Sequence, residues 1–167
     1  HKEYRRQRQM CIRDRYNTIS IDKKHRFSIP AKYRNDFIKS NESKVVVTKD
    51  PQYPSLKLYK GSEWELISLK LQSLQGLDPV VRNIQWTILG NASVTDLNPN
   101  GRMLILLPQE LIDYAQLDQT NKISFVGMGN KFEIWNTENW NLRQTGGSLA
   151  TEILDVVLPT SIKEMSF

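Results

Sequence analysis

A short polar turn, Asp22-Lys23-Lys24-His25-Arg26, holds the residues best suited to bind a ligand. A carboxylate four residues before an arginine, at opposite shoulders of a tight turn, can hold the guanidinium in one orientation. An exposed ion pair of this kind adds only about 0–1 kcal/mol of stability, so its benefit would be direction. The planar guanidinium suits phosphate oxygens or a guanine edge, and the two lysines suit backbone phosphates. A turn-stabilising ion pair without any ligand is the alternative interpretation.

A second turn, Asn98-Pro-Asn-Gly-Arg102, repeats the arginine 76 residues later. Asn-Gly is comfortable at positive φ, which favours a tight turn at this point. Asn98 stands where the first turn has Asp22, and its side-chain oxygen can accept one hydrogen bond from Arg102 without contributing a charge. No lysine flanks this second turn. We therefore expect Arg102 to be held less firmly than Arg26, and the first turn to contribute more to binding.

Residues 1–15 resemble a translated sequencing adapter. From Arg5 onward, codons can be chosen that spell a widely used transposon-based adapter, which ends in Met10-Cys-Ile-Arg-Asp-Arg15. A natural basic arm that binds nucleic acid is the alternative, but a match of this length in one reading frame argues against coincidence. We therefore assign residues 1–15 to an adapter-derived scar outside the fold.

Setting the scar aside changes the charge of the protein. The whole chain has 23 basic and 18 acidic residues, and removing the scar's six basic and two acidic residues leaves 17 and 16, a net charge of +1 instead of +5. Overall basicity thus gives no support for nucleic-acid binding. Locally, Tyr16–Lys39 carries six basic residues against two acidic ones, a net charge of +4. This cluster would suit either a phosphate-facing surface or a solvated helix face.

The residues left after the scar offer little for catalysis. His25 is the one histidine left and no cysteine remains, so a His/Cys metal cluster and a cysteine nucleophile are excluded. Ser28 near His25 has no obvious orienting acid. Gly127-Met-Gly129 lacks the lysine and helix context of a phosphate-binding loop. We therefore predict a protein that is not an enzyme, with no metal, no cofactor and no small-molecule substrate.

The two turns belong to a longer repeat, and a repeat decides the fold before any other feature does. The corresponding segments are Asn17–Ile21 and Asn91–Leu97, Lys44–Val47 and Lys122–Phe125, and Lys57–Trp64 and Glu133–Trp140. The strand expected from Arg102 to Pro108 is longer than its counterpart from Arg26 to Pro30, by six steps against four. The chain is therefore a tandem duplication.

Apolar periodicity and helix signals predict the elements that position the turns. Alternation at Ile19, Ile21, Phe27 and Ile29 indicates half-buried strands on both sides of the first turn. Pro30 then opens a helix over 31–38, and residues 45–47 and 56–59 form two further strands. The second half is expected to repeat this order.

A helical pair of about thirty residues is expected to bridge the halves. Ser62 and Glu65 form a predicted capping box at the start of the first helix. Its apolar stripe is Trp64, Ile67, Leu71 and Leu74. The second helix begins at Asp78-Pro79, buries Val81, Ile84 and Ile88, and ends at Gly90.

Each half, of roughly fifty residues, is too small to close a core comfortably by itself. We therefore expect the halves to pair face to face, with Trp64 and Trp140 filling the shared core. After Thr145-Gly-Gly-Ser, a linker-like stretch, Leu149, Ile153 and Val157 predict a weak amphipathic helix. We expect this C-terminal end to move or to dock on a neighbouring subunit.

From about Tyr16 to Trp140, the sequence resembles the MraZ family of transcriptional regulators, whose two AbrB-like halves each carry an Asp-x-x-x-Arg signature. Asp22 and Arg26 match that signature in full, whereas Asn98 departs from it and Arg102 keeps it. His25 also departs, because the family usually has glycine before the arginine. The resemblance implies a β-rich α+β fold in which two swapped-hairpin halves pair into one core. The expected parts are the scar at 1–15, a first half at 16–64, a helical bridge at 65–90, a second half at 91–140 and a tail at 141–167.

The resemblance also implies a function. A sequence-specific DNA-binding regulator would place Lys23, Lys24, Arg26 and Arg102 on double-stranded promoter DNA, with Asp22 and Asn98 orienting the arginines. The family forms rings of many subunits that bind short repeats before its own division and cell-wall gene cluster, usually as a repressor. The resemblance also implies a cytoplasmic, nucleoid-associated protein, and the lack of cysteine after residue 15 fits a reducing cytoplasm. No apolar run approaches the length needed to span a bilayer. The alternative is an antitoxin-type protein-interaction module with the same fold.

Overall fold

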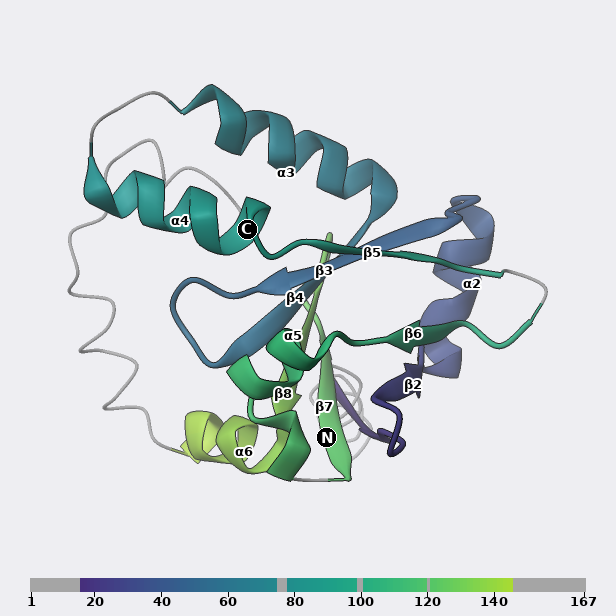
Figure 1. Ribbon diagram of the computed structural model, residues 1–167. Coiled ribbons are helices and arrows are strands. Elements are labelled where there is room, and N and C mark those ends of the chain that lie inside the picture. Colours follow the sequence, from purple (N-terminus) through teal and green to yellow (C-terminus); the bar gives the residue numbers. More distant parts are fainter. Residues whose placement is uncertain (1–15, 75–77, 99–100, 120, 146–167) are drawn as a thin grey trace, which may run out of the picture.

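The computed structural model describes residues 16–74, 78–98, 101–119 and 121–145 (Figure 1). The first half contains β1 (Tyr16–Ser20), β2 (Arg26–Ser28), α2 (Ala31–Lys39), β3 (Lys44–Lys49), β4 (Ser55–Lys60) and α3 (Gly61–Ser73). After α4 (Pro79–Leu89) come β5 (Ser93–Asp96), β6 (Leu104–Leu106), α5 (Gln109–Tyr114), the 3-10 helix η1 (Leu117–Gln119), β7 (Lys122–Gly127), β8 (Phe132–Asn136) and α6 (Thr137–Thr145). The adapter-like segment and the expected helix at Leu149, Ile153 and Val157 lie outside these residues.

The order of elements confirms the duplication. β1, β2, α2, β3, β4 and α3 recur as β5, β6, α5, β7, β8 and α6, with α4 between the two sets. Aromatic contacts recur as well: Tyr59 packs on Trp64 with ring centroids 5.7 Å apart, and Trp135 packs on Trp140 at 5.5 Å. The repeat read from the sequence is therefore a repeat in space.

The two halves interleave in one six-stranded antiparallel sheet of order β1-β7-β8-β4-β3-β5. The first strand of each half pairs with the other half: β1 lies beside β7, with Ile19 opposite Ile123, and β5 lies beside β3, with Val94 opposite Val46. β4 and β8 join the halves at the centre, where Lys57 lies opposite Glu133. The expected swapped pairing of two halves is confirmed.

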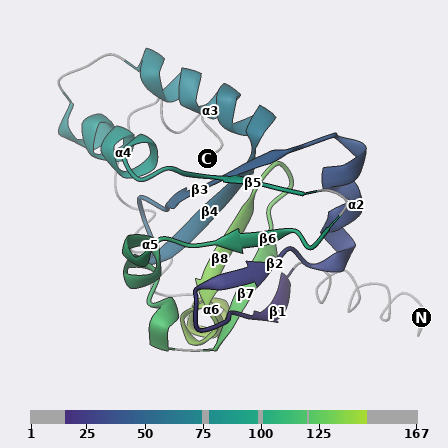
Figure 2. The same cartoon turned by 45° about the vertical axis from the view of Figure 1, so that its right-hand side comes forward.

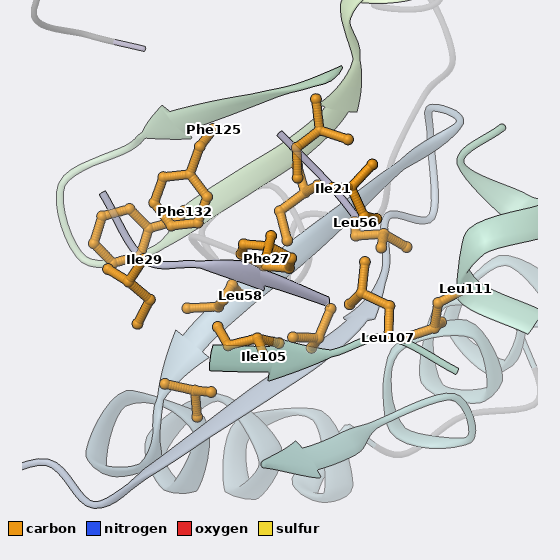
Figure 3. Packing of buried hydrophobic residues seen from close by; sticks show 14 of the residues in the cluster. Ile21, Phe27, Ile29, Leu56, Leu58, Ile105, Leu107, Leu111, Phe125 and Phe132 are labelled. Carbon is orange, nitrogen blue, oxygen red and sulfur yellow. The ribbon is translucent and has the colours of Figure 1, made fainter. Parts of the chain in front are cut away.

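A two-stranded ribbon of β2 and β6 covers one face of this sheet (Figure 2). Phe27 pairs with Ile105, and both side chains point inward among Leu58 and Phe125 of the sheet (Figure 3). This single core draws buried side chains from both halves, including Phe37 and Leu111 of α2 and α5. The expectation of one shared core is therefore confirmed.

The expectation that Trp64 and Trp140 fill that core is wrong. Leu58 and Ile134 face the core, so their neighbours Tyr59 and Trp135 point to the opposite face of the sheet. Trp64 and Trp140 follow β4 and β8 in helices on that opposite face, where they pack on these two aromatic residues and stay partly exposed.

The helical bridge has its own small core on this opposite face. Ile67 and Leu71 of α3 pack with Val81, Ile84 and Ile88 of α4 and with Tyr59 of the sheet. Asp78 caps α4 by accepting a hydrogen bond from the Val80 N–H at 2.9 Å, and Gly90 ends that helix, as expected. The capping box predicted at Ser62 is wrong: α3 begins at Gly61, and the Ser62 hydroxyl donates instead to the carboxylate of Glu42.

The predicted difference in strand length is also wrong, because β2 and β6 each have three residues. The two extra residues of the second half lie before its strand. Equivalent backbone bonds show this: the Ile29 N–H donates to the Met103 carbonyl at 3.0 Å, and the Leu107 N–H donates to the His25 carbonyl at 2.9 Å. His25 therefore corresponds to Met103 in the ribbon, and Arg26 corresponds to Leu104.

Candidate nucleic-acid interface

The Asp22 carboxylate organises the first turn. Its Oδ1 accepts hydrogen bonds from the backbone N–H groups of Lys24 and Arg26, both at 2.9 Å, and its Oδ2 accepts the Nε–H of Arg26 at 2.9 Å. The His25 N–H donates to the Asp22 carbonyl at 3.1 Å and closes the turn. These bonds, first of all the one from the Arg26 backbone N–H, hold the pKa of Asp22 below its usual value. The carboxylate is therefore charged and fully engaged at neutral pH.

The Arg26 guanidinium is held in one direction by this carboxylate. Its Nε is committed to Asp22, whereas its Nη1 and Nη2 make no hydrogen bond to any described residue. The side chains of Arg26 and Asp22 are 42% and 43% exposed, so the Nη edge faces solvent with two parallel donors. Lys23 and Lys24 are exposed beside it. This edge has the donor geometry that phosphate oxygens and guanine O6/N7 accept.

His25 adopts a left-handed backbone conformation, with φ of 63°. That region favours glycine, and a histidine in it is strained by the contact between Cβ and the backbone. The same residue also provides the carbonyl that bonds to Leu107 in the ribbon. His25 therefore links the turn directly to the strand and leaves Arg26 as the first residue of β2.

The second turn closes in the same way, with the Gly101 N–H donating to the Asn98 carbonyl at 3.1 Å. Arg102 is exposed, and it makes no ion pair with any residue in the described part of the chain. It lies two residues before β6, so it is not on the ribbon as Arg26 is. The orienting roles of Asp22 and Asn98 toward a ligand stay predictions.

Antiparallel pairing of the ribbon places each turn beside a helix of the other half. The first turn lies at the end of β6, next to the start of α5, which carries Glu110 and Asp113. The second turn lies at the end of β2 and beside α2, as both views show (Figures 1 and 2). α2 is basic, with Lys32, Arg34 and Lys39. The swap therefore places a basic helix beside the turn that has no lysine of its own, which the linear sequence does not reveal.

A metal-ligand cluster and a membrane-spanning helix are absent from the described residues. Among them, no three His, Cys, Asp or Glu side chains gather where they could hold a metal ion. Within the same ranges, no helix combines the length and apolar character needed to cross a membrane.

The comparison with protein families decides the identity of this fold. The family described as MraZ protein, antitoxin-like, matches residues 16–85 and 88–145, and each match contains one copy of the repeat. The chain belongs to the MraZ family. Its two interleaved halves are thus the tandem AbrB-like halves that the resemblance implied.

Curated relatives carry the same family name. The chain is 39% identical to the transcriptional regulator MraZ of Hydrogenovibrio crunogenus over 125 residues, which are 75% of this chain and 80% of the relative. It is 37% identical to the transcriptional regulator MraZ of Pseudomonas aeruginosa over 151 residues, which are 85% of this chain and 97% of the relative. The protein from Marinomonas is 40% identical over 126 residues, 75% and 81% of the two chains. Full-length MraZ proteins therefore resemble this chain across both halves.

Proposed function

We propose that this MraZ family member is a sequence-specific, DNA-binding transcriptional regulator and not an enzyme. The relatives named transcriptional regulators support regulation of transcription. The observation that carries DNA binding is the first turn, where Asp22 holds the partly exposed Arg26 guanidinium and the neighbouring Lys23 and Lys24 are exposed. In this proposal, Arg26 reads a base edge, the lysines bind phosphates, and Arg102 adds a weaker contact.

The proposed target is double-stranded promoter DNA before the family's own division and cell-wall gene cluster, with repression as the outcome. The protein would work in the cytoplasm at the nucleoid. Apart from the scar, the chain has a net charge of only +1, so a single copy would bind DNA weakly. A ring of several copies, each contacting one short repeat, would multiply these weak contacts.

Exposed apolar side chains support assembly. Trp86 on α4 and Val94 on the edge strand β5 are 62% and 60% exposed, although both are large apolar residues. Edge strands and exposed apolar patches are typical subunit contacts. Light scattering should therefore give a mass many times that of one chain, and a stable monomer at micromolar concentration would contradict the ring.

The test is binding to the DNA upstream of the gene that encodes this chain. Fluorescence anisotropy should show tight binding to that duplex and weak binding to a shuffled duplex of the same composition, with affinity falling as salt rises. Equal affinity for both duplexes would contradict sequence specificity. A chain that binds neither duplex but captures a partner protein would instead support the antitoxin-type interaction module.

A further inference from the structure

The outward face of the β2–β6 ribbon carries two leucines where polar residues are expected. Phe27 and Ile105 point into the core, so Arg26, Ser28, Leu104 and Leu106 point outward. Leu106 is 56% exposed and Leu104 is 37% exposed. The core beneath the ribbon is filled by other side chains, so these leucines contribute little to the fold.

The register of the ribbon places Leu106 directly opposite Arg26, and Leu104 directly opposite Ser28. The bonds at Ile29–Met103 and Leu107–His25 make these two cross-strand pairs the non-hydrogen-bonded ones, whose Cα atoms lie about 4.5 Å apart. That separation is close to the spacing of about 3.4 Å between successive bases along one DNA strand. If Arg26 contacts the edge of one base, Leu106 is therefore placed to contact the adjacent base of the same strand.

The chemistry around the leucines points to one ligand. Arg26 lies on the same face of the ribbon, and Lys23 and Lys24 are exposed in the turn before it, so this end of the ribbon favours a polyanion. The major groove of DNA admits a two-stranded β-ribbon, and the apolar group that its base edges present there is the C5 methyl of thymine. We propose that Leu106, assisted by Leu104, contacts a thymine methyl group next to the base that Arg26 reads. This inference rests on the proposed DNA-binding function and adds a residue that selects the neighbouring base.

The test removes only the methyl group. The full chain is used to select a duplex from a random-sequence pool, and that duplex is then synthesised with thymine or with deoxyuridine at every thymine position. The chain should bind the deoxyuridine duplex about fourfold more weakly for each contacted methyl group. Leu106→Ser, which keeps only the assisting Leu104, should lose most of the preference for the thymine duplex. Leu66→Ser, which changes an equally exposed leucine (56%) on α3, should keep the preference for thymine.

The possible outcomes distinguish failure of the proposed DNA-binding function from failure of the thymine contact alone. If no duplex is enriched, the proposed DNA-binding function fails and the thymine contact fails with it. If a duplex is enriched but thymine and deoxyuridine bind alike, only the thymine contact is wrong. An unchanged thymine preference in both Leu106→Ser and Leu106→Ala would also overturn the thymine contact. If these variants failed to assemble but kept the preference, Leu106 would contact another subunit and the thymine contact would again be wrong. Thermal unfolding of each variant confirms that it is folded.

Discussion

Lys57 of β4 forms a buried ion pair with Asp50, which follows β3, with 3.3 Å between Lys57 Nζ and Asp50 Oδ2. Both side chains are less than a tenth exposed. Oδ1 of Asp50 also accepts the backbone N–H groups of Gln52 and Tyr53, and its carbonyl accepts the Tyr114 hydroxyl. One carboxylate therefore supports the β3–β4 loop, while its lysine partner lies at the seam between the halves.

Asp50→Ala should lower the free energy of unfolding by about 3–5 kcal/mol, because it removes the carboxylate that pairs with the buried Lys57 ammonium. Urea unfolding followed by tryptophan fluorescence measures this loss. The control is Asp36→Ala on the exposed face of α2, which should change stability by no more than about 0.5 kcal/mol. An Asp50→Ala protein as stable as that control would show that the ion pair is not structural.

Lys131 should make stability rise with pH. Burial, with repulsion from Lys57, lowers its pKa to about 8 from an ordinary 10.5. Between these values the unfolded chain holds a proton that the folded chain has lost, so the free energy of unfolding rises as pH increases through this window. Below pH 8 the folded protein carries the buried charge at a cost.

Lys131→Met should therefore stabilise the protein at pH 7 by about 1–3 kcal/mol, since it removes a buried cation. The gain should shrink as pH is raised from 8 toward 10. Urea unfolding of the wild type and the variant at several pH values measures the difference between their free energies of unfolding. Tyr59 and Tyr114, whose pKa values are raised by burial, titrate in both proteins, so their contribution cancels in this difference. A constant difference across this range would mean that Lys131 keeps an ordinary pKa in the fold.

His25 should be replaceable by glycine with a gain in stability. At φ of 63°, glycine avoids the Cβ strain, and we expect a gain of about 0.5–1 kcal/mol after its larger unfolded-state entropy is counted. His25→Val should lose more than about 1 kcal/mol, because a β-branched residue is an outlier in this region. Calorimetric melting temperatures in the order Gly, His, Val check the prediction, and the reverse order would refute it.

Substitutions at the three proposed DNA contacts of the first turn should distinguish base recognition from charge attraction. Arg26→Ala should weaken binding to the selected duplex by about 1–3 kcal/mol, and Arg26→Lys should restore little of this because lysine lacks the planar pair of donors. Lys24→Ala should weaken all duplexes alike and flatten the salt dependence. Lys23→Ala should do the same. Anisotropy titrations at several salt concentrations distinguish these effects.

Arg102→Ala should cost less affinity than Arg26→Ala, because no carboxylate in the described part of the chain pairs with Arg102. Asn98→Asp should narrow this difference by holding the Arg102 guanidinium, as Asp22 holds that of Arg26. The same titrations measure both changes. If Arg26→Ala binds DNA normally, or loses binding only by unfolding, the arginine turn is structural and DNA binding loses its geometric support.

Residues 1–15 should be dispensable. A chain beginning at a methionine just before Tyr16 should melt at the same temperature and bind the same duplex with the same specificity. Native genomic DNA that encoded these residues in frame would contradict the adapter origin and restore the basic-arm interpretation.

Much of the fold follows from periodicity in the sequence, because the repeat, the strand alternation and the caps at Asp78 and Gly90 are local signals. The position of the second turn relative to its strand could not be predicted from the sequence in this way. Arg26 and Arg102 are equivalent by motif, yet Leu104 takes the place of Arg26 in the ribbon. Which residues enter a strand after a turn depends on which side chain fills the core, and here Met103 is buried.

The other features that the sequence did not predict depend on contacts between residues far apart in the chain. Ser62 has a capping-box pattern, but Glu42 from the loop before β3 takes its hydroxyl. No local signal in the sequence marks Lys57 and Lys131 as buried, yet the folded chain covers both side chains. The candidate site was predictable at Asp22–Arg26 because its bonds are local, whereas the basic α2 beside Arg102 is a product of the swap.

The interleaving of the two halves also determines when each strand can find its partner during synthesis of the chain. Ile19 pairs with Ile123, 104 residues later, so the first half cannot complete its sheet until β7 has left the ribosome. At about 5–20 residues per second, its apolar strands wait about 5–20 seconds for their partners. During that interval, a finished second half on a neighbouring nascent chain offers the same complementary edge. Two chains made side by side would then exchange halves and form a domain-swapped dimer, without any change in sequence.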